Sequence, residues 1–179
     1  ATSIDLSTFT IRELSQQRTV IERLPEVVGT YIASGKKNEV IQIAEMDVNL
    51  ADKTGRQLFA KVPGVFVYDM DGSGNQLNIA TRGLDPHRSW EYNVRLNGVM
   101  TNSDLYGYPA SHFSAPMESI ERVELIRGTA SLQYGATYGG MVNYVTKTAD
   151  TTRKISYEGN FNYGSFNTRS MYHAIGGKI

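Results

Sequence analysis

Three cationic or protonatable side chains gather near the end of one predicted strand and suit the binding of an anion. Arg82 ends the strand, and His87 and Arg88 lie in the loop that follows. A guanidinium group can hold a carboxylate through two parallel hydrogen bonds, which indicates a carboxylate-bearing ligand. Strand alternation puts Arg82 opposite Leu77 and Ile79, so we expect it to point away from the apolar side. The alternative is that Arg82 forms a structural ion pair inside the domain.

The segment 69–75, DMDGSGN, has oxygen-bearing side chains at the spacing of the first ligands in an EF-hand calcium loop. The twelfth position of such a loop requires a bidentate glutamate, and Ala80 occupies it here. We therefore interpret the segment as a surface loop in which Gly72 and Gly74 permit tight turns. A soluble calcium-binding domain is the alternative, which calcium titration would decide.

The sequence carries no pattern that indicates catalysis. Its three histidines, His87, His112 and His173, lack metal-ligand spacing, and no G-x-S-x-G motif is present. The absence of cysteine excludes a thiolate zinc site, a disulfide framework and a cysteine nucleophile. We therefore predict no enzymatic activity, no resident cofactor and no bound metal.

The composition is typical of one globular domain. The 179 residues can bury a core, and 40% of them are hydrophobic. Lys and Arg together number 18, as do Asp and Glu, so the chain lacks the basic field that nucleic-acid binding usually requires. No apolar run approaches the ~18 residues that a membrane helix needs. We exclude nucleic acid as a partner.

Short strands and helices are predicted to position these side chains. Thr54 and Gln57 match a capping box at the start of a helix that Pro63 ends. Asn97-Gly98 suits a type I′ hairpin turn. The expected strands are 39–48, 65–68, a half-buried strand over 77–81, 92–96, 99–100, 120–126 and 141–145, with a helical turn at 130–134 and a long exposed loop at 101–116.

The last part of the chain has a different pattern. Residues 155–163 alternate strictly between apolar and polar side chains, and a second alternating run reaches Ile179 after a predicted turn at 164–167. Aromatic-rich strands near 10 residues suit the start of a transmembrane β-barrel, apolar outward and polar inward. Two strands alone would leave backbone groups unpaired in lipid, so we expect the rest of the barrel to lie outside this chain.

Four motifs follow one another in the order KVPGV at 61–65, IATRGL at 79–84, VRLNGV at 94–99 and MESIERVELIRGTASLQYGATYGGMVNYVTK at 117–147. In this order they resemble the plug domain of TonB-dependent outer-membrane receptors, closest to the ferric-citrate or siderophore type. The resemblance implies an α+β fold, a small mixed-sheet plug with short helices at 39–148. A connector and the first barrel hairpin would follow at 149–179, and residues 1–38 would form a linker with a candidate Ton box at 24–30.

The resemblance also implies a function, the TonB-dependent uptake of an iron chelate such as ferric citrate or a similar siderophore. The receptor would lie in the outer membrane of a Gram-negative bacterium, with its barrel in contact with lipid and its plug inside the barrel, facing the periplasm. Ser73, Arg82 and Tyr108 match ligand-contacting plug positions of the ferric-citrate type, and His87 and Arg88 join them as neighbours. Ser73 stands where that type has threonine, and Tyr108 replaces an amide side chain, which weighs against citrate itself.

The candidate Ton box is the second site that the resemblance implies. Pro25, Glu26, Val27 and Val28 would form an extended strand without a sheet, and a TonB-like energy-transducing protein would bind it by strand addition. The alternative is that this segment pairs inside its own domain.

Four charged residues alternate in sign along one predicted strand: Glu121, Arg122, Glu124 and Arg127. The resemblance implies that they anchor the plug to the barrel wall. The alternative is an ordinary solvated or cross-strand salt-bridge face.

Two other functions are kept as alternatives. Glycan receptors share the overall plan but typically read DASAAAIYGSRAANGVI where this chain reads RGTASLQYGATYGGMVN. A plug-like module that transmits a signal to a partner is the second, because residues 1–23 leave room for an upstream signalling domain.

Overall fold

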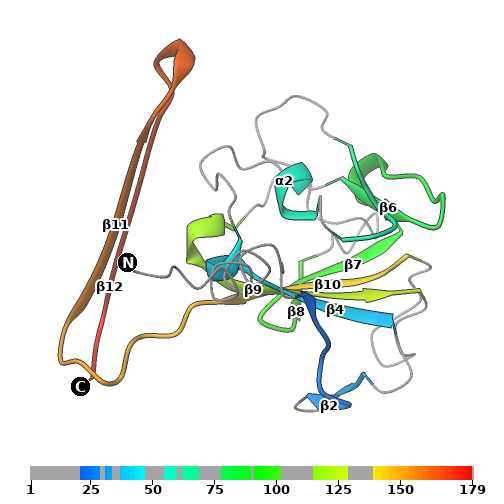
Figure 1. Ribbon diagram of the computed structural model, residues 1–179, viewed down its shortest axis with the longest axis horizontal. Helices are drawn as coiled ribbons and strands as arrows, with labels where there is room; N and C mark the ends of the chain where they lie inside the picture. Colours follow the sequence, from blue (N-terminus) through cyan, green and yellow to red (C-terminus); the bar gives the residue numbers. More distant parts are fainter. Residues whose placement is uncertain are drawn as a thin grey trace, which may run out of the picture.

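The computed structural model describes residues 21–28, 31–33, 37–46, 55–59, 62–68, 78–89, 91–101, 115–128 and 139–178 (Figure 1). The strands are β1 (Ile21–Glu22), β2 (Val27–Val28), β3 (Tyr31–Ile32), β4 (Lys37–Gln42), β5 (Val65–Val67), β6 (Ile79–Thr81), β7 (Tyr92–Leu96), β8 (Val99–Met100), β9 (Ile120–Arg127), β10 (Gly140–Thr146), β11 (Ser156–Tyr163) and β12 (Arg169–Gly176). The helical elements are α2 (Gly55–Phe59) and the 3-10 turns η1 (Ile43–Glu45), η3 (His87–Ser89), η4 (Met117–Ser119) and η6 (Ser165–Asn167).

Six strands form one mixed sheet in the order β1-β4-β9-β10-β7-β8. β7 and β10 run parallel, whereas the other neighbouring strands of this sheet are antiparallel. Val123 of β9 lies between Ile41 of β4 and Tyr144 of β10 in the register, so these three side chains share one face. The mixed sheet with short helices agrees with the predicted α+β class.

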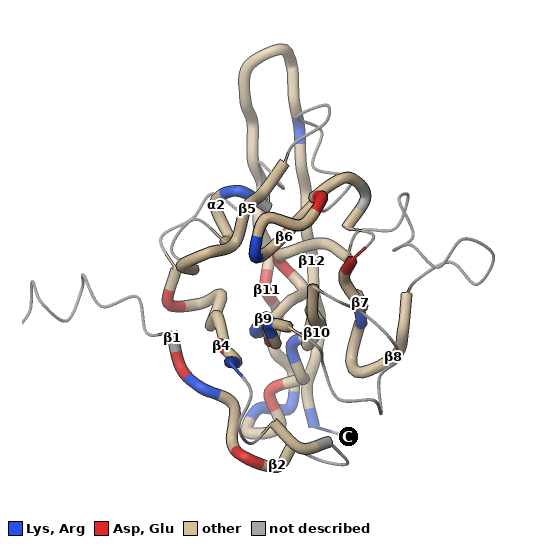
Figure 2. The backbone as a smooth tube through the Cα atoms, turned by 90° about the vertical axis from the view of Figure 1, so that its right-hand side faces the viewer, with Lys and Arg blue, Asp and Glu red and all other residues tan. Residues whose placement is uncertain are grey.

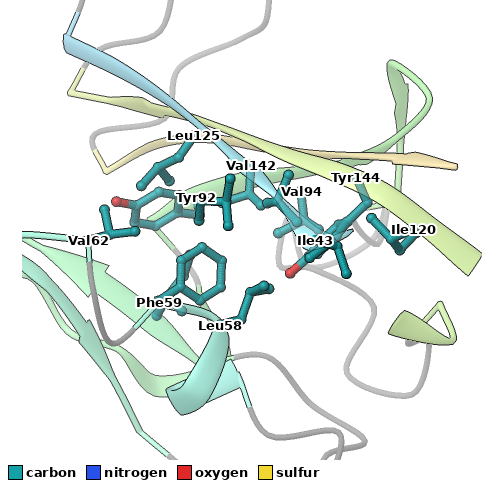
Figure 3. Packing of buried hydrophobic residues seen from close by; sticks show 13 residues of the cluster. Ile43, Leu58, Phe59, Val62, Tyr92, Val94, Ile120, Leu125, Val142 and Tyr144 are labelled. Atoms are coloured by element: carbon teal, nitrogen blue, oxygen red, sulfur yellow. The ribbon is translucent and has the colours of Figure 1, made fainter. Parts of the chain in front are cut away.

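The main core lies between that face of the sheet and α2 (Figure 3). Leu58 and Phe59 of α2 point toward Tyr92 and Val142 of the sheet. Because a helix of five residues is too short to be stable alone, the burial of these two side chains, about 1.5–3 kcal/mol each, holds it in place. The full cluster is Ile41, Ile43, Leu58, Phe59, Val62, Ile79, Tyr92, Val94, Ile120, Val123, Leu125, Val142 and Tyr144.

A smaller apolar cluster covers part of the opposite face of the sheet. Its buried members are Leu24, Ala33, Val40, Ile126 and Met141. Successive residues of a strand point to opposite faces, which is why Ile126 lies here and its neighbour Leu125 in the main core. The β2–β3 pair packs on this side, away from α2 (Figure 1).

Two predicted strands differ from the structure. The strand expected at 39–48 ends at Gln42, where η1 begins, and residues 47–50 lie outside the described residues. The strand expected to be half-buried is instead buried at all three positions of β6. Its one polar member can be buried because it has a partner: the Thr81 hydroxyl accepts a hydrogen bond from Tyr92 Oη at 2.8 Å.

The predicted type I′ turn is confirmed. Asn97 and Gly98 connect β7 to β8 with positive φ angles of 50° and 81°. The Asn97 side chain also bonds to β10, where its Oδ1 accepts from the Thr146 N–H at 3.0 Å and its Nδ2 donates to Thr146 Oγ1 at 3.0 Å. The turn is therefore fastened to the neighbouring strand as well as to its own hairpin.

The predicted C-terminal hairpin forms from β11 and β12 and stands apart from the sheet (Figure 1). Tyr157 pairs with Ile175 and Phe161 with Met171, so the large apolar side chains of both strands share one face, and all four are exposed. The opposite face carries the polar side chains of Ser156, Glu158, Asn160, Asn162 and Ser170, together with Tyr172 and Ala174, while Arg169 and His173 lie on the apolar face. The alternation expected from the sequence is therefore present in the structure.

Candidate functional site

The loop after β6 begins with a reversal of the backbone at the predicted ligand-binding arginine. Arg82 has a left-handed conformation with φ 59°, Gly83 follows with φ 75°, and the Leu84 N–H closes the turn on the Thr81 carbonyl at 3.1 Å. Strand alternation thus stops at Arg82 and cannot set its direction. Asn78, which alternation placed on the same face, is buried, while Arg82 is exposed.

The guanidinium group of Arg82 lies against the end of β9. A Cβ atom added to Gly128 would lie 2.9 Å from a terminal nitrogen of Arg82, so the guanidinium group lies directly over this glycine and would have to shift if Gly128 carried a side chain. Arg82 is therefore exposed but held beside the sheet rather than extended into solvent. Its role in ligand binding stays a prediction.

The other predicted ligand residues are placed less completely. His87 opens η3 and is exposed, and its backbone N–H donates to Asp85 Oδ1 at 2.9 Å. Arg88 lies in the same turn, but its side chain is outside the described part of the structure, as are Ser73 and Tyr108 entirely. The structure thus puts Arg82 and His87 on one loop and leaves the convergence of all five as a prediction.

An open pocket of about 320 Å³ lies beside Arg82. It is lined by 64–66 at the start of β5, by Ala80 and Thr81 of β6, and by residues of the 82–86 loop. Among the described residues of this lining, Arg82 alone is charged, and the remaining side chains are mainly apolar. The arrangement suits a ligand with one anionic group and an apolar part.

A buried polar cluster that the sequence did not indicate lies at the same end of the sheet. Tyr92 donates to Thr81 Oγ1, which lies 3.3 Å from the Gly139 carbonyl. Burial raises the pKa of Tyr92, opposed by the Thr81 hydrogen bond and by the positive charges of Arg127 and Arg82. Arg82 and Arg127 therefore both place positive charge near the Tyr92 hydroxyl.

The four predicted anchoring residues have partners within the plug. Arg127 pairs with Glu39 of β4, and its other terminal nitrogen donates to the Pro63 carbonyl at 2.6 Å. Arg122 bonds to Glu124 at 3.0 Å and lies 3.7 Å from the exposed Glu121.

Glu124 lies inside the plug, not on a solvated strand face. Its side chain is 1% exposed and also accepts from Asn143 Nδ2 at 2.9 Å, which fixes it within the sheet. Contact of these residues with a barrel wall stays a prediction.

The candidate Ton box is paired, which corrects the expectation of a strand without a sheet. Val27 and Val28 form β2 and pair antiparallel with Ile32 and Tyr31 of β3. The pairing arises because Leu24 and Ala33, at the two ends of the hairpin, are buried against the sheet. The alternative considered for this segment, a strand that pairs inside its own domain, is the one observed. Recognition by a partner is not tested by this pairing.

Within the described ranges, no group of three or more His, Asp or Glu side chains is arranged to hold a metal ion. The calcium-like segment 69–75 lies outside those ranges. None of the helices in the described part of the chain is long and apolar enough to cross a membrane.

Curated relatives of the chain are transport proteins. The chain is 26% identical over 171 residues to the vitamin B12 transporter BtuB of Vibrio vulnificus, a match that covers 94% of this chain and 26% of that protein. It is 32% identical over 120 residues to the ferric enterobactin receptor of Pseudomonas aeruginosa, covering 59% of this chain and 16% of the receptor. The chain therefore spans about a quarter or less of the length of these relatives.

Solved structures show the same fold. The pyoverdine outer membrane receptor FpvA from Pseudomonas aeruginosa PAO1 superposes with a TM-score of 0.60 at 20% identity, over 80% of this chain and 20% of that one. The ferric citrate transporter FecA in its unliganded form superposes with a TM-score of 0.52 at 21% identity, over 78% of this chain and 22% of that one. At these identities the likeness concerns the fold alone.

The family model described as TonB-dependent Receptor Plug Domain matches residues 32–142, more than half of the chain. This match confirms the resemblance seen in the sequence. Because the relatives are transporters and receptors, the prediction that the chain is not an enzyme is also confirmed. The chain belongs to the plug-domain family of TonB-dependent outer-membrane receptors.

Proposed function

We propose that this chain forms the gate and the first barrel strands of a receptor that imports an iron chelate across the outer membrane. The observation that carries the proposal is the β11–β12 hairpin, which gathers its large apolar side chains, except Tyr172, on one face together with Arg169 and His173 and places most of its polar side chains on the other. Phe161 and Met171 are 63% and 69% exposed on the apolar face. Such a face suits lipid, provided that neighbouring strands pair with the hairpin edges.

The junction between plug and hairpin supports an inward-facing polar side. Lys147 follows β10 and forms an ion pair of 2.6 Å with Glu158, which lies on the polar face of β11. The polar face is therefore the one connected to the end of the plug sheet. In a closed barrel it would face the lumen that holds the plug.

The proposed ligand is an iron chelate that carries carboxylate or other anionic groups. Arg82 borders the pocket, and His87 lies exposed on the same loop. The relative that is 32% identical is a ferric enterobactin receptor, which agrees with an iron chelate. A cobalamin is the second candidate, because the match to the vitamin B12 transporter covers 94% of the chain.

A titration of the full receptor with a panel of ligands tests this assignment. Ferric citrate, a ferric catecholate chelate and cyanocobalamin would each be titrated against the wild type and Arg82→Ala. We expect an iron chelate to bind, and Arg82→Ala to weaken its binding at least tenfold because charge-assisted hydrogen bonds contribute about 1.5–3 kcal/mol. Arg82→Lys should recover part of the affinity, since it keeps the charge but loses the planar fork.

Two outcomes would contradict the assignment. Selective binding of cyanocobalamin would replace the iron chelate with the second candidate. A lower melting temperature of Arg82→Ala with unchanged affinity would make Arg82 a structural residue.

Energy coupling is proposed to use residues 24–28. A TonB-like protein in the periplasm would bind this segment by strand addition and pull the plug open. Val27→Pro removes a backbone N–H and should abolish uptake while ligand binding stays intact. Normal uptake in that variant would exclude the segment from coupling.

A further inference from the structure

The turn between β11 and β12 holds an aromatic side chain outward. The Gly164 N–H donates to the Thr168 carbonyl at 2.9 Å, and the Thr168 N–H donates to the Ser165 carbonyl at 3.2 Å, so the turn is closed by its own backbone. Between them, Phe166 and Asn167 both have left-handed conformations, with φ 57° and 61°. A bulky residue in this conformation is strained, and such strain gathers at functional positions. Because Phe166 is 103% exposed, this presentation points to a contact made outside the described residues.

Arg169, the first residue of β12, is held in a fixed direction beside this turn. Its guanidinium carbon lies 6.0 Å from the centre of the ring of Tyr163, the residue opposite it in β11, which is within the range of a cation–π attraction. Its Nε atom donates to Asn167 Oδ1 at 3.2 Å. Among the described residues no carboxylate pairs with Arg169, so its two terminal nitrogens can donate to an anion. We call Tyr163, Arg169 and the turn between them the hairpin tip.

The hairpin tip lies at the end of the apolar face that the proposed barrel turns toward lipid. The pair of Tyr163 and Arg169 lies two residues beyond the pair of Phe161 and Met171. Ile155, exposed just before β11, lies eight residues before Tyr163 on the same alternation. At about 3.3 Å per residue and a tilt of about 40°, these steps span roughly 20 Å of membrane, close to the ~25 Å apolar band of an outer-membrane barrel. Arg169 is therefore placed at the boundary between hydrocarbon and headgroups, where a cation is tolerated.

His173 is the other ionisable side chain of β12 on this face, and one of its ring nitrogens has a partner there. The Tyr157 hydroxyl lies 2.6 Å from His173 Nδ1, and the two rings are stacked. Gly159, opposite His173, leaves room for this contact, because a Cβ atom there would lie 2.8 Å from the Tyr157 hydroxyl. The middle of the face thus pairs its polar groups with each other, whereas Arg169 at its end keeps donors for a ligand.

The turn lies at the end of the molecule that the proposed function assigns to the outside of the cell. Figures 1 and 2 both show the turn at the end where β6 lies and the base of the hairpin at the end where β2 lies. The proposed ligand-binding loop follows β6, and the proposed partner-binding segment contains β2. The turn would therefore reach the outer leaflet. In a Gram-negative outer membrane this leaflet consists largely of lipopolysaccharide, whose lipid A headgroup carries phosphate groups.

We propose that the hairpin tip is a lipid A binding site, in which Arg169 holds a phosphate group and Phe166 lies among the headgroups beside it. The proposal rests on the proposed role of β11 and β12 as barrel strands. A guanidinium group binds phosphate through two parallel hydrogen bonds, and Tyr163 and Asn167 keep it directed. Aromatic residues are favoured at the level of the headgroups, which suits the exposure of Phe166.

Titration of the purified full receptor with lipid A tests the site. Bisphosphorylated lipid A would be added to the receptor in dodecyl maltoside micelles, and bound lipid measured by native mass spectrometry. We expect Arg169→Gln to weaken binding at least fivefold, and Arg169→Lys to recover part of the affinity because it keeps the charge without the planar fork. Arg153→Gln is the matched control, since the Arg153 side chain is 75% exposed at the base of the hairpin, and it should leave the affinity unchanged. Equal affinities of the wild type and Arg169→Gln would overturn the proposal.

Two further ligands test the site with the wild-type receptor alone, so the result stands even if Arg169→Gln does not fold. Lipid A without its phosphate groups should bind at least fivefold more weakly than the bisphosphorylated form. Phosphatidylglycerol, a phospholipid of the periplasmic leaflet, should also bind at least fivefold more weakly. Equal affinity for lipid A with and without phosphate would overturn the phosphate contact. Phosphatidylglycerol that binds as tightly as lipid A would overturn the assignment to the outer leaflet.

A spin label separates failure of the site from failure of the function on which it rests. Phe161→Cys on the apolar face and Asn160→Cys on the opposite face would be labelled in the full receptor in liposomes, and the accessibility of each label to oxygen, which concentrates in hydrocarbon, measured. If Phe161→Cys is no more accessible than Asn160→Cys, the barrel assignment fails and the site with it. If Phe161→Cys is the more accessible and lipid A binding does not depend on Arg169, the barrel strands survive and the lipid A site is wrong.

Discussion

The plug sheet and the β11–β12 hairpin are built from strands of similar length but differ in what covers them. β9 and β11 have eight residues each, yet β9 is buried at most positions whereas β11 is exposed at most. The apolar side chains of the sheet pack against other described residues of this chain, whereas those of the hairpin are mostly exposed. Burial within the plug therefore accounts for the stability of β9 and β10, whereas β11 gains little from burial against the described part of the chain.

A substitution that disrupts the middle of the sheet should have the largest effect. A Cβ atom on Gly140 would lie 1.9 Å from the Ile126 carbonyl oxygen, and Gly140 has φ 131°. We expect Gly140→Ala to lower the free energy of unfolding by about 3 kcal/mol or more, because β9 and β10 must separate. Gly164→Ala in the hairpin is the control, because an added Cβ atom would lie 3.7 Å from Thr168 Cβ and Gly164 has φ −133°. Similar midpoints of urea unfolding for Gly140→Ala and Gly164→Ala would contradict the stated difference between sheet and hairpin.

The next largest difference in stability loss is expected between a glutamate of the plug sheet and one of the hairpin. Glu124→Ala leaves Arg122 and Asn143 without their buried acceptor and should cost about 2–4 kcal/mol. Glu158→Ala removes an exposed ion pair with Lys147 and should cost less than about 1 kcal/mol. Thermal melts of both variants at low and high salt would check this. A large loss of stability in Glu158→Ala would mean that the ion pair between hairpin and plug stabilises the plug.

The two hairpin turns offer a smaller contrast in backbone strain. Gly98→Val should cost about 1–3 kcal/mol through its positive φ alone, since nothing lies within 4 Å of the added Cβ atom. Phe166 holds a left-handed conformation with φ 57° in the turn of the β11–β12 hairpin, so Phe166→Gly should relieve strain. Amide exchange of each hairpin would report both effects. Unchanged exchange in Gly98→Val would argue against a strained turn.

The smallest effect concerns a hydroxyl in the core. Tyr144 Oη has no hydrogen-bond partner among the described residues, and burial raises the pKa of Tyr144 well above its ordinary value. Tyr144→Phe should therefore change stability at neutral pH by less than about 1 kcal/mol, in the stabilising direction.

The effect of Tyr144 on stability should appear at alkaline pH. Above about pH 10 the unfolded chain loses the tyrosine proton while the folded chain keeps it, so wild-type stability falls as pH rises. Tyr144→Phe should show a shallower fall than the wild type between pH 9 and 11, measured by urea unfolding. Parallel curves would show that Tyr144 reaches solvent.

Local chemistry made several features predictable from the sequence. The Asn97-Gly98 turn was predictable because both residues tolerate the positive φ that a type I′ turn requires. The paired faces of β11 and β12 followed from the alternation of side chains, which has the same period as the strand. The plug family followed from the order of four motifs.

Tertiary contacts decided the features that local patterns could not. The strand over 77–81 was expected to be half-buried, but Asn78, Ala80 and Thr81 are all buried, and the Thr81 hydroxyl accepts a hydrogen bond from Tyr92 inside the core. Arg82 was expected to follow strand alternation, yet the backbone reverses at that residue and its side chain lies against Gly128.

The candidate Ton box shows most clearly what the sequence alone determined and what it could not. Its composition indicated a short extended strand, and the strand is present as β2. Its closure depends on Asn38, fourteen residues after Leu24, and on Ile126 and Met141 much later in the chain. A strand's conformation is encoded by its own residues, whereas the burial of its ends requires surfaces that exist only once the sheet has folded.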